Sequence, residues 1–228
     1  MRHRTQTVFC DLETLPALEW TDGDKARAAR KAVPGNYTKP DSIEKWIAEN
    51  ADDVWRRTAL DPTRGRILAI GLAVDDGPVS THYNEGGTLE GERALLEALL
   101  PHIGDNVSST WVAHNGGLFD FRWVKRRSAK HGLYDLSRAF HVNKPWESHL
   151  VDTLAVWNAP DRPQGGTGSM DSLCEFFGIS RADNPISGAE VFDRWAAGDH
   201  EAIKAHLVDD VARLRDVYRI MQRCGWCS

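Results

Sequence analysis

Two carboxylates, Asp11 and Glu13, stand two positions apart at the end of the apolar segment TVFCD. Side chains alternate along a strand, so both carboxylates would point to the same face of it. Two like charges at one spot are costly unless a cation or a proton neutralises them. The pair therefore predicts a site that binds a cation or shares a proton.

Further acidic residues lie in the segments HNGGLFD, VDT and HLVDDV. Asp120 and Asp210 each border an apolar stripe that must face the sheet, whereas Asp209 points about 100° further round its helix and is expected to be solvated. No lysine or arginine matches these acids, which favours hard divalent cations with oxygen ligands, Mg²⁺ or Mn²⁺. Two such ions about 3.5–4 Å apart would support the cleavage of a phosphodiester bond.

His206 precedes Asp210 by four residues, so both side chains project from the same face of a helix. The pKa of an imidazole lies near neutrality, and His206 is therefore a candidate general base for the attacking water. The alternative is a histidine that only makes a hydrogen bond at the edge of the sheet.

The elements that would position these residues alternate between strand-like segments and amphipathic helices. TVFCD, RILAIGLAV, GPVSTHYN and STWVAHN predict four strands, and HLVDTLAVW predicts a fifth that turns into a helix. Helices are predicted at 88–103, from GLFD to Gly132, and from 200 to about 224. This order predicts an α/β protein in which helices cover both faces of a mixed five-stranded sheet.

An insertion at about 16–60 separates the first two strands, where a short hairpin would normally be enough. Asp41 and Glu44 match a capping box for a helix inside it. Its aromatic residues argue against disorder. The insertion is either a packed flap or an arm that grips substrate, within a single domain that spans 1–228.

The composition is that of a soluble globular protein, with 41% hydrophobic and 27% charged residues. No apolar stretch approaches the ~20 residues of a membrane helix. The net charge of −5 excludes a basic field over the whole surface, so a nucleic-acid partner would need a local basic patch. The cysteine pattern indicates a reducing compartment, and CGWC at 224–227 is interpreted as a frayed terminus rather than a redox pair.

Taken in order, DLET, HNGGLFD and HLVDDV resemble the three motifs of the DEDD 3′–5′ exonucleases. PGNYTKP…RILAIG and ISGAEVFDRWAAGD resemble the subgroup called predicted DNA-polymerase-B-like exonucleases, found in bacteria and viruses. The resemblance implies a ribonuclease H-like fold and metal binding by Asp11, Glu13, Asp120 and Asp210. The third motif departs from the family, because His206 stands at the spacing that the tyrosine subfamily fills with tyrosine.

The same resemblance implies a set of substrate contacts. Thr14 and Leu15 would border the 3′-terminal nucleotide, Leu15 against its base. Asn115 would contact substrate or brace the second motif, and Phe119 would be a core residue or a stacking partner. Asp152 would give structural support.

Basic residues after Asp120 would form either a phosphate-contact patch, with Arg126 in it, or only a solvated helix face. They are Arg122, Lys125, Arg126, Arg127 and Lys130. DKARAARK in the insertion, and more weakly Arg64 and Arg66, are further candidates.

These observations predict an enzyme, a two-metal-ion 3′–5′ exonuclease that releases nucleoside 5′-monophosphates. Its substrate would be a nucleic acid with a free 3′ end, with DNA favoured over RNA. It would act alone or beside a separate polymerase in the cytoplasm of a bacterium or a virus-infected cell, away from membranes. The alternatives are a non-catalytic module that binds nucleic-acid ends, and an endonuclease on the same fold.

Overall fold

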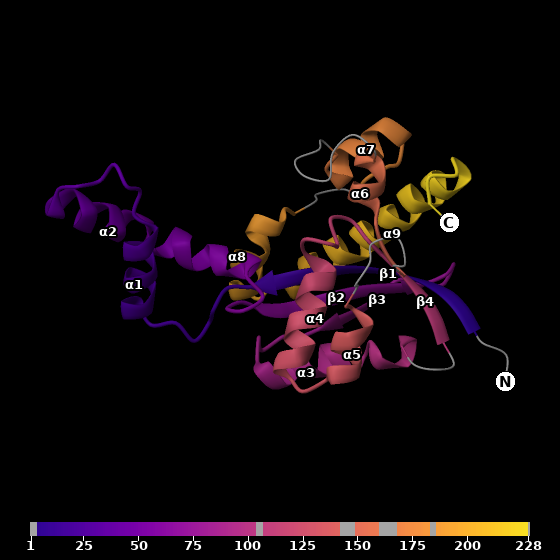
Figure 1. Cartoon of the computed structure of the whole chain (residues 1–228), viewed down its shortest axis with the longest axis horizontal. Helices are drawn as coiled ribbons and strands as arrows, with labels where there is room; N and C mark the ends of the chain where they lie inside the picture. The colour runs from indigo at the N-terminus through magenta and orange to yellow at the C-terminus, as the bar shows by residue number, and fades with distance from the viewer. Residues whose placement is uncertain (1–3, 104–106, 142–148, 160–167, 183–185, 228) are drawn as a thin grey trace.

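The structure is a computed structural model that describes residues 4–103, 107–141, 149–159, 168–182 and 186–227 (Figure 1). Its centre is a five-stranded sheet in the order β3-β2-β1-β4-β5. The strands are β1 (Arg4–Leu15), β2 (Arg66–Val74), β3 (Ser80–Tyr83), β4 (Val107–Ala113) and β5 (Leu150–Asp152). β1 pairs antiparallel with β2 and parallel with β4, so the predicted mixed sheet is confirmed.

Helices cover both faces of this sheet, as predicted. One face packs against α3 (Leu89–Glu97), α4 (Asp120–Lys130) and α5 (Tyr134–Ala139), with Trp111 and Trp123 in its core. The other face packs against α8 (Val191–Ala196) and α9 (His200–Arg223). Two further helices, α6 (Thr153–Asn158) and α7 (Met170–Phe177), lie beside α9 (Figure 1).

Side chains of β1 point alternately to the two faces of the sheet, and this alternation decides which face Asp11 and Glu13 lie on. Val8, Cys10 and Leu12 are buried in the core under α3 and α4. Phe9 and Leu15 are buried in the clusters that α8 and α9 cover. Asp11 and Glu13 lie between Phe9 and Leu15 in the alternation, and so they face α9.

The insertion between β1 and β2 contains two helices and a short 3₁₀ turn. α1 (Asp22–Ala32) and α2 (Pro40–Arg56) form the arm that projects from the sheet in Figure 1, and η1 (Arg57–Leu60) leads back to β2. The predicted capping box in α2 is wrong: the helix begins at Pro40 without a side-chain cap. The capping box of the arm joins Thr21 and Asp24 at the start of α1.

Smaller differences from the predicted elements have local causes. The helix predicted at 88–103 ends at Glu97 and continues as the 3₁₀ turn η2 (Leu100–His102), because the proline at 101 has no amide to donate. Another 3₁₀ turn, η4 (Gly188–Glu190), precedes α8. Cys224 and Cys227 follow the end of α9 as free thiols. None of the helices in the described ranges combines the length and the apolar character needed to cross a membrane.

Candidate metal centre

The four acids predicted to bind metal line one cavity of about 430 Å³ at the end of β1. Asp11 and Glu13 come from β1, Asp120 from the first turn of α4, and Asp210 from the middle of α9. His206 lines the same cavity. The structure thus brings together residues that lie almost 200 positions apart in the sequence.

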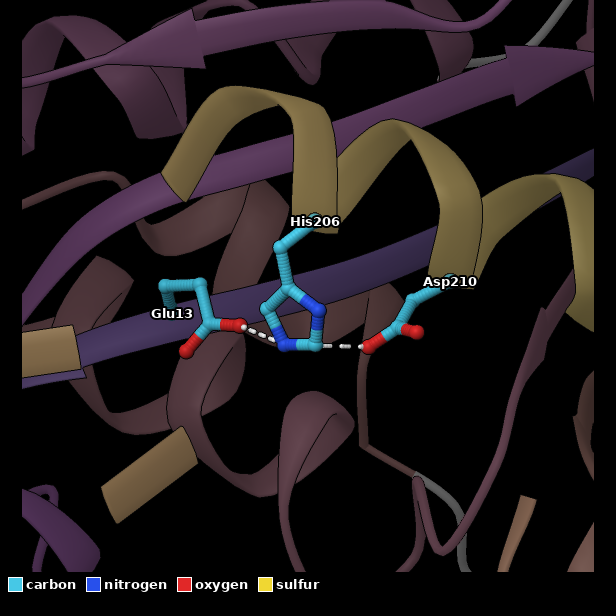
Figure 2. A group of neighbouring side chains, drawn as sticks. All are labelled: Glu13, His206 and Asp210. Carbon is cyan, nitrogen blue, oxygen red and sulfur yellow. Dashed lines mark ion pairs between the residues drawn. The ribbon is translucent and has the colours of Figure 1, made fainter. Parts of the chain in front are cut away.

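The His206 imidazole lies between two of these carboxylates (Figure 2). Its Nε2 is 3.3 Å from Glu13 Oε1 and 3.4 Å from Asp210 Oδ2. Burial alone would lower the pKa of His206, but the hydrogen bond to Glu13 and the charge of Asp210 raise it above its usual value. When it is protonated, His206 is a counter-ion between Glu13 and Asp210.

The carboxylates raise one another's pKa. Burial raises the pKa of Asp11 well above its usual value, and the charges of Asp120, Asp210 and Glu13 raise it further. Burial also raises the pKa of Glu13, although its contact with His206 opposes the shift. The ionised form of this group of acids is therefore unfavourable without added positive charge.

Asp120 fits a divalent cation best of all, because one of its oxygens has no partner. Its side chain is 1% exposed, and Oδ1 makes no hydrogen bond. Burial raises the pKa of Asp120 to about 8. A cation held by oxygen ligands would satisfy this atom. Elsewhere in the cavity, one ligand-type atom from each of Glu13, His206 and Asp210 lies within 4.8 Å of the others, so the two carboxylates could also share a cation.

The expectation that no arginine matches these acids is wrong. Arg213, one turn after Asp210 on α9, is 3% exposed and forms an ion pair with it. Arg213 Nη1 lies 2.7 Å from Asp171 Oδ1, and Nε lies 2.9 Å from Asp209 Oδ2. Asp209 also accepts the backbone N–H of Ala182 at 3.1 Å, so the prediction of a solvated Asp209 is wrong as well.

The loop before Asp120 is held by Asp152, and the predicted supporting role of Asp152 is confirmed. Asp152 accepts the backbone N–H groups of Asn115 at 2.9 Å and Gly117 at 3.0 Å, and it caps the start of α6. Asn115 has a left-handed backbone with φ of 60°, a conformation that asparagine tolerates better than most residues. Its carbonyl accepts the N–H of Phe119 at 3.0 Å, which starts the turn into α4. Asn115 thus braces the second motif, as one of its two predicted roles requires.

The three residues expected beside the terminal nucleotide differ in exposure. Thr14 lines the cavity, but its hydroxyl donates to Ala59 O at 2.6 Å. Phe119 is half-buried, packs against Trp123 and also lines the cavity. Leu15 is fully buried, because Ile186 and α8 cover it, so the expected contact between Leu15 and a base is a wrong prediction for this conformation.

The basic helix divides into buried and exposed residues. Arg127 is 1% exposed and pairs with the buried Glu92 of α3, so it is a structural residue and not a phosphate contact. Arg126 is exposed, but it lines a second groove and not the acidic cavity.

Sequence reasoning missed several residues of the cavity: Leu60, Asp171, Arg181 and Arg213. The sequence does contain a signal for Arg213. It follows Asp209 by four residues and Asp210 by three, and at these spacings an arginine can pair with both on one helix face. Leu60 and Arg181 lie in turns that periodicity does not describe.

A mixed β-sheet with helices on both faces, and with acids from β1, α4 and α9 at one end, defines the class of ribonuclease H-like proteins. The chain belongs to the RNase H superfamily, whose family model matches residues 57–222. The predicted ribonuclease H-like fold is confirmed, and the family and the fold indicate a nuclease. None of the curated proteins matches this chain.

Among solved structures, the chain is similar to a family B DNA polymerase from the hyperthermophilic archaeon Pyrobaculum calidifontis. The TM-score is 0.57 at 15% sequence identity, and the match covers 95% of this chain. It covers 24% of the polymerase, so this chain spans about a quarter of its length. At this identity the likeness concerns the fold alone.

The raised pKa of Asp120 predicts how stability depends on pH. An unfolded aspartate loses its proton near pH ~3.9, whereas folded Asp120 does so at about 8. The folded state binds more protons between these values, so the free energy of unfolding of the metal-free protein should fall as pH rises from about 4 to about 8. Asp120 alone contributes at most about 1.4 kcal/mol per pH unit. Urea denaturation in chelator at several pH values measures this dependence.

Asp120→Asn should flatten that dependence, because the amide does not titrate. Asp216→Asn is the matched control: Asp216 lies on α9, half-exposed and outside the cavity, and the variant should keep the wild-type slope. An Asp120→Asn variant with the wild-type slope would contradict the raised pKa.

Proposed function

We propose that this protein is a metal-dependent 3′–5′ exonuclease. The observation that carries the proposal is the gathering of Asp11, Glu13, Asp120 and Asp210 in one cavity, with an unpartnered Asp120 oxygen buried inside it. The motif resemblance supports the exonuclease class and the 3′ polarity. DNA is the favoured substrate, and the cytoplasm of a bacterium or a virus-infected cell is the proposed location.

The four acids would hold two divalent cations, Mg²⁺ or Mn²⁺. When bound, such ions supply Lewis-acid activation of a water nucleophile and stabilise charge on the leaving oxygen. Asp120 would provide a ligand that needs no rearrangement, since its Oδ1 has no partner to give up. Glu13 and Asp210 would exchange their contacts with His206 for contacts with a cation.

His206 is the proposed general base. Its Nε2 faces the cavity between Glu13 and Asp210, where it can accept a proton from water. The two carboxylates keep its pKa above the usual value. Positive charge at these carboxylates would lower that pKa and leave Nε2 free to accept the proton.

Arg213 is proposed to fix Asp210. It reaches Asp210, Asp209 and Asp171 with one guanidinium, which holds the Asp210 carboxylate in one orientation beside His206. Fixed ligands lower the cost of assembling a catalytic site.

Labelled oligonucleotides test the proposed activity. Wild-type protein with Mg²⁺ or Mn²⁺ should shorten 5′-labelled single-stranded DNA from its 3′ end and release nucleoside 5′-monophosphates, and RNA more slowly. A 3′-phosphate should block the reaction, because the added phosphate would not fit where the free 3′-hydroxyl is proposed to bind. Asp11→Asn and excess chelator should each abolish cleavage, because both remove the cation from the site. Gel electrophoresis and product chromatography give the readout.

Asp216→Asn serves again as the matched carboxylate control and should digest DNA at the wild-type rate. Rapid nicking of circular single-stranded DNA would instead favour the endonuclease. Tight binding of 3′ ends without any product would favour the end-binding module, and full activity in chelator would contradict the metal requirement.

His206→Ala should lower the cleavage rate by ~10²–10⁴, because the water loses its proton acceptor. His206→Tyr restores the residue type that the tyrosine subfamily has at this spacing, and it should recover part of the rate if the position mainly orients the water. Steady-state rates across pH 5.5–9, roughly the range in which an imidazole titrates, measure both effects.

His200→Ala is the control for this helix, since His200 lies on α9 and contacts Tyr83 outside the cavity. A His206→Ala variant with the wild-type rate would leave His206 only a packing role.

A further inference from the structure

We infer that the groove beside α4 binds the single-stranded nucleic acid that leads into the acidic cavity. The inference rests on the proposed function and extends it from the terminal nucleotide to the strand behind it. The groove has a volume of about 720 Å³, within the ~300–1,000 Å³ range of ligand sites.

One wall of this groove is cationic. Arg122, Lys125 and Arg126 of α4 line it, and both arginines are exposed. Neither arginine forms a close ion pair with a carboxylate in the part of the chain that the structure describes, although the charge of Arg122 helps to lower the pKa of Asp61. Lys125 Nζ lies 2.6 Å from His141 Nδ1 and forms no ion pair with a carboxylate of the described residues. Three cations that form no close ion pair with a carboxylate of the described residues fit the phosphates of a nucleic acid.

The groove contains little opposing charge. Asp152 is the one carboxylate among its described lining residues. Its oxygens accept the N–H groups of Asn115, Gly117 and Leu154. The local field along α4 is therefore positive, although the whole chain carries a net charge of −5.

The opposite wall is apolar and ends in the exposed ring of Trp226, beside the half-buried ring of Trp157. Trp226 is 48% exposed and lies 6.0 Å, between ring centroids, from Trp157. A neighbouring hollow of about 580 Å³ shares Val156 and Trp226 with the groove and continues along Trp157. A phosphate-binding wall facing aromatic rings is the arrangement that binds unpaired bases by stacking, whereas paired bases have no free face to offer.

The groove and the acidic cavity lie on either side of one turn. Asn115 and Phe119 line the cavity, and Gly117, between them in the sequence, lines the groove. Gly117 is exposed and presents no side chain, so a strand can cross the turn from the cationic wall to the acids. Because the groove and the cavity are continuous, we assign the groove to the same nucleic-acid strand whose 3′ end lies at the acids.

The test compares long and short single strands under chelation, so that no cleavage occurs. Fluorescence anisotropy should show that an oligonucleotide of about 12 nucleotides binds more tightly than one of about three, because only the long strand reaches the groove. The double variant Arg122→Ala/Arg126→Ala should weaken binding of the long strand and leave the short one unchanged. The slope of log affinity against log salt should fall by about 0.7 for each arginine removed. Trp226→Ala should weaken binding about 5-fold or more at an unchanged salt slope.

Lys130→Ala is the matched control, because Lys130 is exposed on the same helix but lies outside the groove. Thermal melting checks that each variant folds. An arginine double variant with wild-type affinity and salt slope would overturn the inference, as would equal affinity for long and short strands. A groove that prefers an acidic polypeptide such as polyglutamate over the oligonucleotide would overturn it too.

The outcomes separate this inference from the proposed function. If the wild type digests 3′ ends and the double variant binds and digests equally well, the groove assignment fails and the exonuclease stands. If the wild type shows no cleavage but its binding depends on Arg122 and Arg126, the exonuclease fails and the groove stands.

Discussion

Four carboxylates meet at one end of β1, and the repulsion among them is the constraint on which the rest of the site depends. Burial and the neighbouring charges raise the pKa of Asp11, Glu13 and Asp120 together. A fold would not retain such a group for stability alone, because ionised acids of this kind oppose folding at neutral pH. His206, one turn before Asp210 on α9, and Arg213, one turn after it, reduce this cost by contacting the Asp210 carboxylate. A divalent cation would neutralise the negative charge that remains.

The framework of the protein keeps these acids from moving apart. Asp11 and Glu13 are fixed because Phe9 and Leu15 on the same face of β1 are buried under α8 and α9. Asp120 is fixed because Asp152 holds the loop before α4 through two backbone N–H groups. On the far side of the sheet, the buried pair of Arg127 and Glu92 ties α4 to α3. Removing either partner of such a pair would leave an uncompensated buried charge.

Much of this arrangement follows from local sequence patterns. Alternation in β1 predicted that Asp11 and Glu13 share a face, and the spacing of four predicted that His206 and Asp210 lie together on a helix. α1 escaped prediction because its only apolar residues are alanines, which leave no hydrophobic stripe to detect.

Burial that depends on distant segments was harder to predict. The side chain of Leu15 is covered by α8. The charge of Arg127 is neutralised by Glu92, which lies 35 positions away in the sequence. Neither partner can be recognised before the chain is folded.

The central claim is that the four acids form a cation site, and equilibrium binding of Mn²⁺ tests it most directly. Titration calorimetry at neutral pH should detect Mn²⁺ binding to the wild type, with one site lost or strongly weakened in Asp120→Asn, because Asp120 offers the buried unpartnered oxygen. Asp216→Asn should bind as the wild type does. Absence of Mn²⁺ binding to the wild type, or equal binding by Asp120→Asn, would contradict the account.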